Sequence, residues 1–190
     1  LGLYCPAGGL TFNADFERAS GPVGMISQSG GNSAHCVREG IGRGIFFSKV
    51  ISMGNGADLN ESDYLEYLAQ DDETKIITAY IVGVREGPRF LKALKSTAKD
   101  KPVIMFKVGT TESGAEAAKS HTTAMAGSDR VWEGALRQAG VVRADSIEEM
   151  MEITMAMMGR LIKNLDMRPT SSQSWPTLGI FPRALQMYLS

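Results

Sequence analysis

Five short apolar runs alternate with amphipathic segments over residues 23–144, and this alternation restricts the chain to one broad class of fold. The runs cover 23–26, 49–53, 75–82, 102–107 and 141–144. They are apolar throughout rather than at every second position, which is typical of strands buried on both faces of a parallel sheet. The segments between them carry helical periodicity. We therefore expect an α/β fold with a doubly wound, parallel five-stranded sheet.

Capping residues set the expected helices. These are 30–40 opened by Ser29, a helix from Asn60 or Ser62 to Ala69, 88–98 with Pro88 in its first turn, 129–139 closed by Gly140, and a long helix after Ser146. The long helix has a Met-rich apolar stripe at spacings of three and four. That stripe suits core packing, or a partner surface that adapts to its ligand.

The regular pattern defines three segments. Residues 1–20 have no clear period and are expected to be a linker or the end of a preceding domain. Residues 21–165 form the α/β domain. Residues 166–190 contain three prolines and isolated aromatic residues, which is typical of an irregular tail or the truncated start of a further domain.

Composition excludes several classes of function. The formal net charge is −1, so nothing favours nucleic acid or an anionic membrane surface. No apolar run reaches the roughly 18 residues that a membrane-spanning helix needs. Cys5 and Cys36 lack metal-ligand spacing and are expected to be buried thiols, so no metal site is predicted. No signal peptide is visible, and we expect a cytoplasmic protein.

Residues 26–33 read Ile-Ser-Gln-Ser-Gly-Gly-Asn-Ser, where an expected strand ends and a helix begins. Free backbone N–H groups at an uncapped helix N-terminus would suit a phosphate, with Ser29, Gly30 and Gly31 as the candidate binding residues. The segment lacks the Gly-Lys-Ser/Thr of a P-loop and is not a GxGxxG fingerprint. An ordinary strand–helix turn explains the residues about equally well.

His121 lies in a segment rich in small residues, GTTESGAEAAKSHTTAMAGSD over 109–129. This segment follows the fourth run, so it starts at the same carboxyl edge of the sheet as Ser29. A histidine facing a helix N-terminus could act as a nucleophile and carry a phosphoryl group. Alternatively, it is a solvent-facing histidine in a helix-capping turn.

Residues 21–160 resemble the second, flavodoxin-like domain of the ADP-forming (NDP-forming) acyl-CoA synthetases, which are related to the succinyl-CoA synthetase α subunit. The resemblance is carried by GPVGMISQSGGNS (21–33), by FSKVISMGNGADLNESDYLEYLAQDDETKII (47–77), and by residues 101–150, which contain Ser-His-Thr followed by Ala-Gly-Ser-Asp. The last motif is specific to this family.

The resemblance implies a function. It makes His121 the residue that is phosphorylated by an acyl phosphate and that passes the phosphoryl group to ADP. It makes Ser29, Gly30 and Gly31 the phosphate cradle. It implies CoA and Mg-ATP/ADP, bound mainly by a CoA-binding Rossmann domain and an ATP-grasp domain or subunit. An acyl-CoA or carboxylic acid substrate and an oligomeric assembly follow from the same resemblance.

Two positions depart from the family pattern. The family usually has a glutamate that hydrogen-bonds the histidine, in a pattern like Tyr-x-Glu-Gly-Val, and here Val82 occupies that place. Glu86 matches a different, non-catalytic acidic position. Thr123 stands where glycine is usual, and its β-branch resists positive φ. The chain is therefore expected to be either the phosphohistidine domain of an acid–thiol ligase or a non-catalytic scaffold derived from that family.

Overall fold

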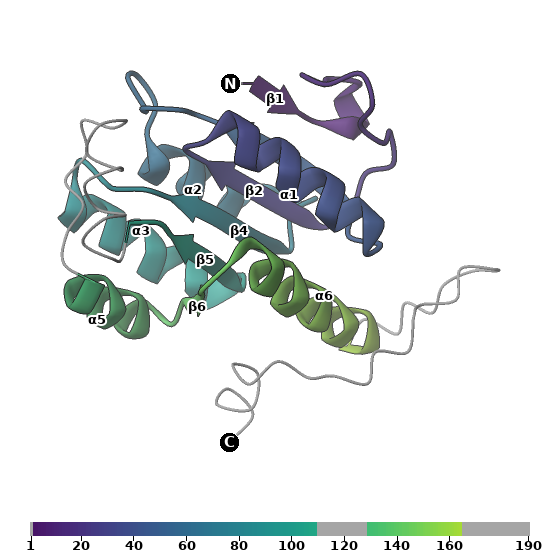
Figure 1. Cartoon of the computed structure of the whole chain (residues 1–190). Helices are drawn as coiled ribbons and strands as arrows, with labels where there is room; N and C mark the ends of the chain where they lie inside the picture. Colours follow the sequence, from purple (N-terminus) through teal and green to yellow (C-terminus); the bar gives the residue numbers. More distant parts are fainter. Residues whose placement is uncertain (1, 110–128, 165–190) are drawn as a thin grey trace.

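The protein is described by a computed structural model that covers residues 2–109 and 129–164 (Figure 1). The elements are β1 (Gly2–Tyr4), η1 (Pro6–Gly8), β2 (Val23–Ser27), α1 (Gly30–Gly42), β3 (Phe47–Ser52), α2 (Glu61–Gln70), β4 (Ile76–Ile81), α3 (Gly87–Asp100), β5 (Val103–Lys107), α5 (Asp129–Ala139), β6 (Val142–Ala144) and α6 (Ile147–Asn164). The predictions for His121, Thr123 and residues 166–190 concern positions outside the described ranges.

One sheet with strand order β1-β3-β2-β4-β5-β6 forms the centre of the fold. The five strands from β2 to β6 are parallel, which confirms the expected α/β class. The expected count of five strands was one short, because β1 adds an antiparallel edge strand against β3. Three residues are too few to show a period in the sequence. Backbone pairing with β3 and burial of Tyr4 stabilise this strand.

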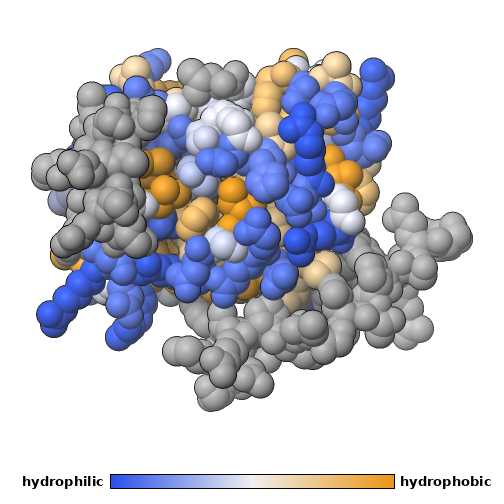
Figure 2. Space-filling view, viewed as in Figure 1, coloured by the Kyte–Doolittle hydropathy of each residue, from blue (hydrophilic) through white to orange (hydrophobic). Residues whose placement is uncertain are grey.

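Helices cover both faces of the sheet, as Figure 1 shows for α1 and α6 on one side and α2, α3 and α5 on the other. Each face has its own apolar cluster. Met150, Met151 and Met158 are buried in the cluster under α1 and α6, so the methionine stripe belongs to the core. The face in Figure 2 is mostly hydrophilic, and apolar atoms show only in small areas between polar ones.

Local sequence explains where the helices begin and end. Ser29 caps α1, and Asn60, rather than Ser62, caps α2 in a reciprocal box with Asp63. Gly140 has φ of 71° just after α5, a conformation that glycine adopts without strain. Among the described residues, no helix has the length and apolarity needed to cross a membrane.

A polar network stabilises the edge of the sheet at which the parallel strands begin, which is their amino edge. Lys49 Nζ lies 2.9 Å from both carboxylate oxygens of Asp71, and Thr74 Oγ1 donates to Asp71 Oδ2 at 2.6 Å. Burial raises the pKa of the Asp71 carboxyl, but hydrogen bonds from Thr74 and Lys49 outweigh burial and bring this pKa below its ordinary value.

The two cysteines, Cys5 and Cys36, differ in how deeply they are buried. Cys36 is fully buried in the α1 face, as expected, and burial raises the pKa of its thiol to about 12. Cys5 is only half-buried, so the expectation of burial was wrong for it. It lies in the short segment after β1, where the chain turns through η1 rather than continuing into the core.

Candidate functional site

The carboxyl ends of β2, β4 and β5 meet at one edge of the sheet. Ser27 pairs with Tyr80, and Tyr80 pairs with Phe106, so the three strands end in register. The first turn of α1 starts at this edge. Gly109, where the His121 segment leaves the described residues, follows the end of β5 by two positions. The predicted phosphate-binding residues, Ser29 to Gly31, and Gly109, where the His121 segment starts, therefore lie at the same edge of the sheet. The order of strands and helices in the sequence predicted this arrangement.

The first turn of α1 is partly capped. Ser29 Oγ accepts a hydrogen bond from the Asn32 N–H at 3.3 Å, which corrects the expectation of an uncapped helix end. The N–H groups of Gly30 and Gly31 have no acceptor among the residues that the structure describes. A Cβ added at Gly31 would meet no atom of the described residues within 4 Å, so the side of the helix at this residue is open. Two backbone donors and the helix dipole remain for an anion.

Gln28 joins the end of β2 to the turn that follows β4. Its Oε1 accepts hydrogen bonds from the N–H groups of Val82 at 2.6 Å and Gly83 at 3.0 Å. Its Nε2 donates to the Gly83 carbonyl at 2.7 Å. This side chain extends the strand pairing beyond the end of the ladder. The sequence reasoning missed this role, because the partners are more than 50 positions away.

Val82 is the residue that, according to the resemblance described above, stands where a glutamate is expected. It is half-buried and packs against the apolar cluster of the α1 face, as does Tyr80 two positions earlier. Side chains two positions apart share one face of a strand. The fixed backbone at Val82 therefore directs its side chain to the same side of the sheet as the first turn of α1.

Tyr80 connects this face to α1. Asn32 Nδ2 donates to the Tyr80 hydroxyl at 2.7 Å, and the Tyr80 ring packs edge-on against Phe106 with 5.5 Å between centroids. Burial is the main cause of the raised pKa of Tyr80, and the Cys36 thiol adds to it. The phenol is therefore neutral at physiological pH and can contribute a hydrogen bond beside the helix end.

Lys107 is a second residue that the sequence reasoning missed. It ends β5 and is only 2% exposed. Its Nζ donates to the Val108 carbonyl and lies 5.1 Å from the centroid of the Trp132 ring in α5. In the sequence it resembles a solvent-facing lysine at a strand end, because its contact with Trp132 of α5 joins residues 25 positions apart.

Over 2–109 and 129–164, no three His, Cys, Asp or Glu side chains gather in the way that a metal site requires. One feature of the carboxyl edge suits an anion, namely the two N–H donors of the α1 first turn that have no acceptor among the described residues.

Comparison with known families gives one match over most of the chain. Residues 20–157 match the succinyl-CoA ligase like flavodoxin domain. The matched range begins three residues before β2 and ends within α6. It therefore includes the candidate site and omits β1.

Two relatives with similar sequences are ADP-forming acetate–CoA ligases. The ADP-forming acetate–CoA ligase I of Archaeoglobus fulgidus is 42% identical over 78% of this chain and 22% of its own length. The α subunit of ADP-forming acetate–CoA ligase II of Pyrococcus furiosus is 47% identical over 72% of this chain and 30% of its own length.

A solved structure has the same fold. The dinucleotide-forming acetyl-coenzyme A synthetase 1 of Candidatus Korarchaeum cryptofilum, in complex with phosphate and ADP, superposes with a TM-score of 0.72 at 34% identity. The match covers 80% of this chain and 33% of that one. The chain thus spans between a fifth and a third of the length of these three relatives.

Proposed function

Because this chain belongs to the family of succinyl-CoA ligase like flavodoxin domains, we propose that it is the phosphohistidine-bearing domain of an ADP-forming acyl-CoA synthetase. His121 relays a phosphoryl group between an acyl phosphate and ADP. One observation carries the proposal: the free donors of the α1 first turn lie at the same sheet edge as the root of the segment that bears His121. The names of the relatives as ADP-forming ligases support it.

The proposed chemistry has three displacements. A phosphate oxygen attacks the acyl carbon of acyl-CoA, the C–S bond breaks, and the CoA thiolate leaves. An unprotonated ring nitrogen of His121 then attacks the phosphorus of the acyl phosphate, the N–P bond forms, and the P–O bond to the acyl group breaks to release the carboxylate. Finally, a β-phosphate oxygen of ADP attacks the same phosphorus, the new O–P bond forms and the N–P bond to His121 breaks, which gives ATP and free His121.

This chain contributes the nucleophile and an anion site to that sequence. Ser29 caps the third N–H of α1. In this proposal, the first two N–H groups, those of Gly30 and Gly31, donate to the phosphoryl group. These donors stabilise the negative charge of the phosphoryl group without a lysine or arginine. CoA and Mg-ATP/ADP are bound mainly by a CoA-binding Rossmann domain and an ATP-grasp domain or subunit. The subunit organisation of the Pyrococcus furiosus relative supports an assembly of this kind.

A non-catalytic scaffold is the second candidate, and one observation favours it. Val82 replaces the family's usual carboxylate and packs against an apolar cluster, so the described part of the site offers no carboxylate at this position to orient the histidine. In the scaffold alternative, the domain retains its fold and its contacts with the other domains but no longer transfers phosphate. The two candidates predict opposite results for phosphorylation of His121.

The test is labelling of the assembled enzyme with radioactive phosphate, from Mg-ATP or from acyl-CoA and phosphate. We expect a label that is acid-labile and base-stable, as phosphohistidine is, and we expect His121→Ala to remove it. His35→Ala is the matched control, because the other histidine of the chain is exposed on α1 and should not change the label. A label that survives in His121→Ala moves the nucleophile elsewhere, and a folded wild-type assembly without label supports the scaffold.

A further inference from the structure

A groove between α2 and the edge strand β1 has no part in the proposed chemistry. Its volume is about 690 Å³. Leu3 of β1 and its register partner Ile51 of β3 form the floor, and Tyr64 and Tyr67 of α2 form one wall. Register partners share one face of a sheet, and Ile51 belongs to the apolar cluster under α2, α3 and α5. The groove therefore lies on that face, opposite α1.

The groove brings together apolar side chains that water reaches. Among residues 2–109 and 129–164, five large apolar side chains are exposed, and four of them line this groove. These four are Leu3, Leu10, Leu59 and Tyr67, each between 42% and 52% exposed. Single exposed apolar residues are ordinary, but a continuous apolar surface marks an interaction site. A small-molecule site encloses most of its ligand, so a lining that is half exposed favours a polypeptide.

The backbone of β1 offers hydrogen bonds beside the groove. Met53 N–H donates to the Ser27 carbonyl of β2 at 2.9 Å, so Ile51, two positions earlier, also directs its backbone groups toward β2. Leu3, opposite Ile51, therefore turns its N–H and C=O to the open side of β1. Neither group has a partner among the residues that the structure describes. Unpaired groups at a sheet edge can pair with an extended segment of another chain.

The rim of the groove is acidic. Over residues 50–74 the chain has seven Asp or Glu residues and no Lys or Arg. Asp63 lines the groove, and Asp58 and Glu66 directly precede two of its exposed apolar residues in the sequence. These carboxylates favour an occupant that carries positive charge.

Nearby cations leave this rim negative. Lys49 and Arg89 each pair with two carboxylates, so neither supplies positive charge in excess. A second copy of the chain would bring an equally acidic rim against the first, and like charges across an interface are unfavourable. The charge therefore favours a different protein with basic residues over self-association.

We propose that the groove between α2 and β1 is a docking surface for an extended segment of a partner protein, with apolar side chains on one face and Lys or Arg beside them. The segment pairs with the backbone of Leu3 and places its apolar side chains between Leu59 and Tyr67. Its cations lie near Asp58 and Glu66. Because the groove and the first turn of α1 lie on opposite faces of the sheet, docking does not depend on the proposed phosphoryl transfer.

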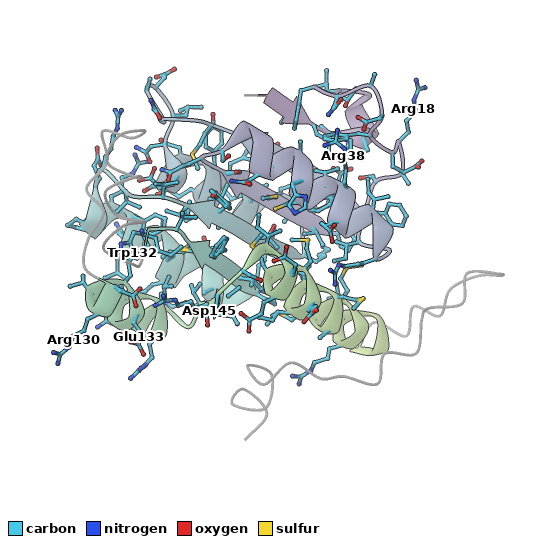
Figure 3. All side chains as sticks on the ribbon, viewed as in Figure 1. Arg18, Arg38, Arg130, Trp132, Glu133 and Asp145 are labelled. Atoms are coloured by element: carbon cyan, nitrogen blue, oxygen red, sulfur yellow. The ribbon has the colours of Figure 1, made fainter. Side chains whose placement is uncertain are left out.

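The test is photocrosslinking in the cells that make the full-length enzyme. Tyr67→benzoylphenylalanine places a photoreactive ring in the groove, and mass spectrometry identifies the peptide to which it crosslinks. Arg130→benzoylphenylalanine is the control, because Figure 3 shows Arg130 pointing outward from α5, which lies beside β6 at the opposite edge of the sheet from β1. We expect position 67, and not position 130, to crosslink to a segment of another protein that is apolar and contains Lys or Arg.

Two substitutions added to the position 67 probe test the apolar and the charged contacts separately. Leu59→Ser should lower the crosslink yield by about 3- to 10-fold, because an apolar contact is lost. Glu66→Lys should lower it by about two- to fivefold, as expected for a reversed surface charge. Val131→Ser is the matched control: it removes the fifth exposed apolar side chain, which lies in α5, and should leave the yield unchanged. Leu10→Ser replaces Leu59→Ser if the latter lowers the melting temperature.

Four results would overturn the inference. The first is the absence of any crosslink from position 67 to another protein, including crosslinks confined to its own chain. The second is a crosslink to the same groove of a second copy, which would make the surface a dimer interface. The third is a crosslinked segment that is acidic or lacks apolar residues. The fourth is an unchanged yield in a folded groove variant, either the serine variant or Glu66→Lys.

Discussion

Restoring a carboxylate at position 82 is the sharpest test of the candidate site. The Val82 backbone is held by Gln28, and its side chain points to the α1 face beside Tyr80. In Val82→Glu, the introduced carboxylate would extend over that face toward the first turn of α1. If His121 comes within reach, the carboxylate can accept the ring N–H, fix the tautomer and leave the other nitrogen free to attack phosphorus.

The expected magnitudes follow from the environment of Val82. Removal of a carboxylate that orients a metal-bound histidine typically costs roughly 10–100-fold in metal affinity or activity. We expect the rate of labelling of His121 to increase on that scale in Val82→Glu. Loss of a half-buried valine costs about 1 kcal/mol of apolar burial. An unpaired carboxylate in the same place adds roughly 1–3 kcal/mol. A variant whose carboxylate pairs with His121 should therefore be less destabilised than one whose carboxylate stays unpaired.

The assay measures single-turnover labelling and urea denaturation on the same preparations. Val82→Gln is the matched control, because it has the same shape and can accept the ring N–H without charge. If orientation dominates, both variants accelerate labelling, and if charge dominates, only Val82→Glu does. A folded Val82→Glu variant with an unchanged or slower labelling rate would refute the reasoning and show that this position no longer controls the histidine.

Three further predictions concern the frame of the site. Gln28→Ala leaves the N–H groups at Val82 and Gly83 without their acceptor and should cost about 1–3 kcal/mol in urea denaturation, and an unchanged midpoint would show that water replaces the amide. Because the pKa of Asp71 is depressed in the folded state, its stabilising effect is complete above the unfolded pKa and is lost as pH falls through the folded pKa. The stability difference between wild type and Asp71→Asn should shrink in denaturation series below about pH 4, and a difference that stays constant with pH would contradict the assigned cause. In α1, Gly40→Ala puts a Cβ 2.8 Å from the buried Phe47 ring and should destabilise the protein by about 1–3 kcal/mol. The Cβ of Gly42→Ala meets no atom within 4 Å, so this substitution should stabilise the protein by up to about 1 kcal/mol. Equal effects of the two substitutions in thermal melts would refute this packing argument.

The sequence by itself determined the parallel strands, the helices between them and the edge at which the candidate site lies. Apolar runs such as 75–82 specify a strand buried on both faces, and Ser29 and Asn60 specify helix starts through hydrogen bonds to residues two or three positions away. These signals are local, so they can be read without the fold. Because all parallel strands point the same way, the order of strand and helix also placed Ser29 and the root of the His121 segment at one edge.

Tertiary structure alone decided which side chains complete that edge. The three residues of β1 become a strand only because β3 offers unpaired backbone groups beside them. Gln28 and Lys107 look like ordinary polar residues at strand ends. The first finds its partners 54 and 55 positions away, and the second finds the face of Trp132 only after α5 packs on the sheet. A hydrogen bond or a cation–π contact between distant segments depends on the placement of both backbones, and no local pattern of residues encodes that placement.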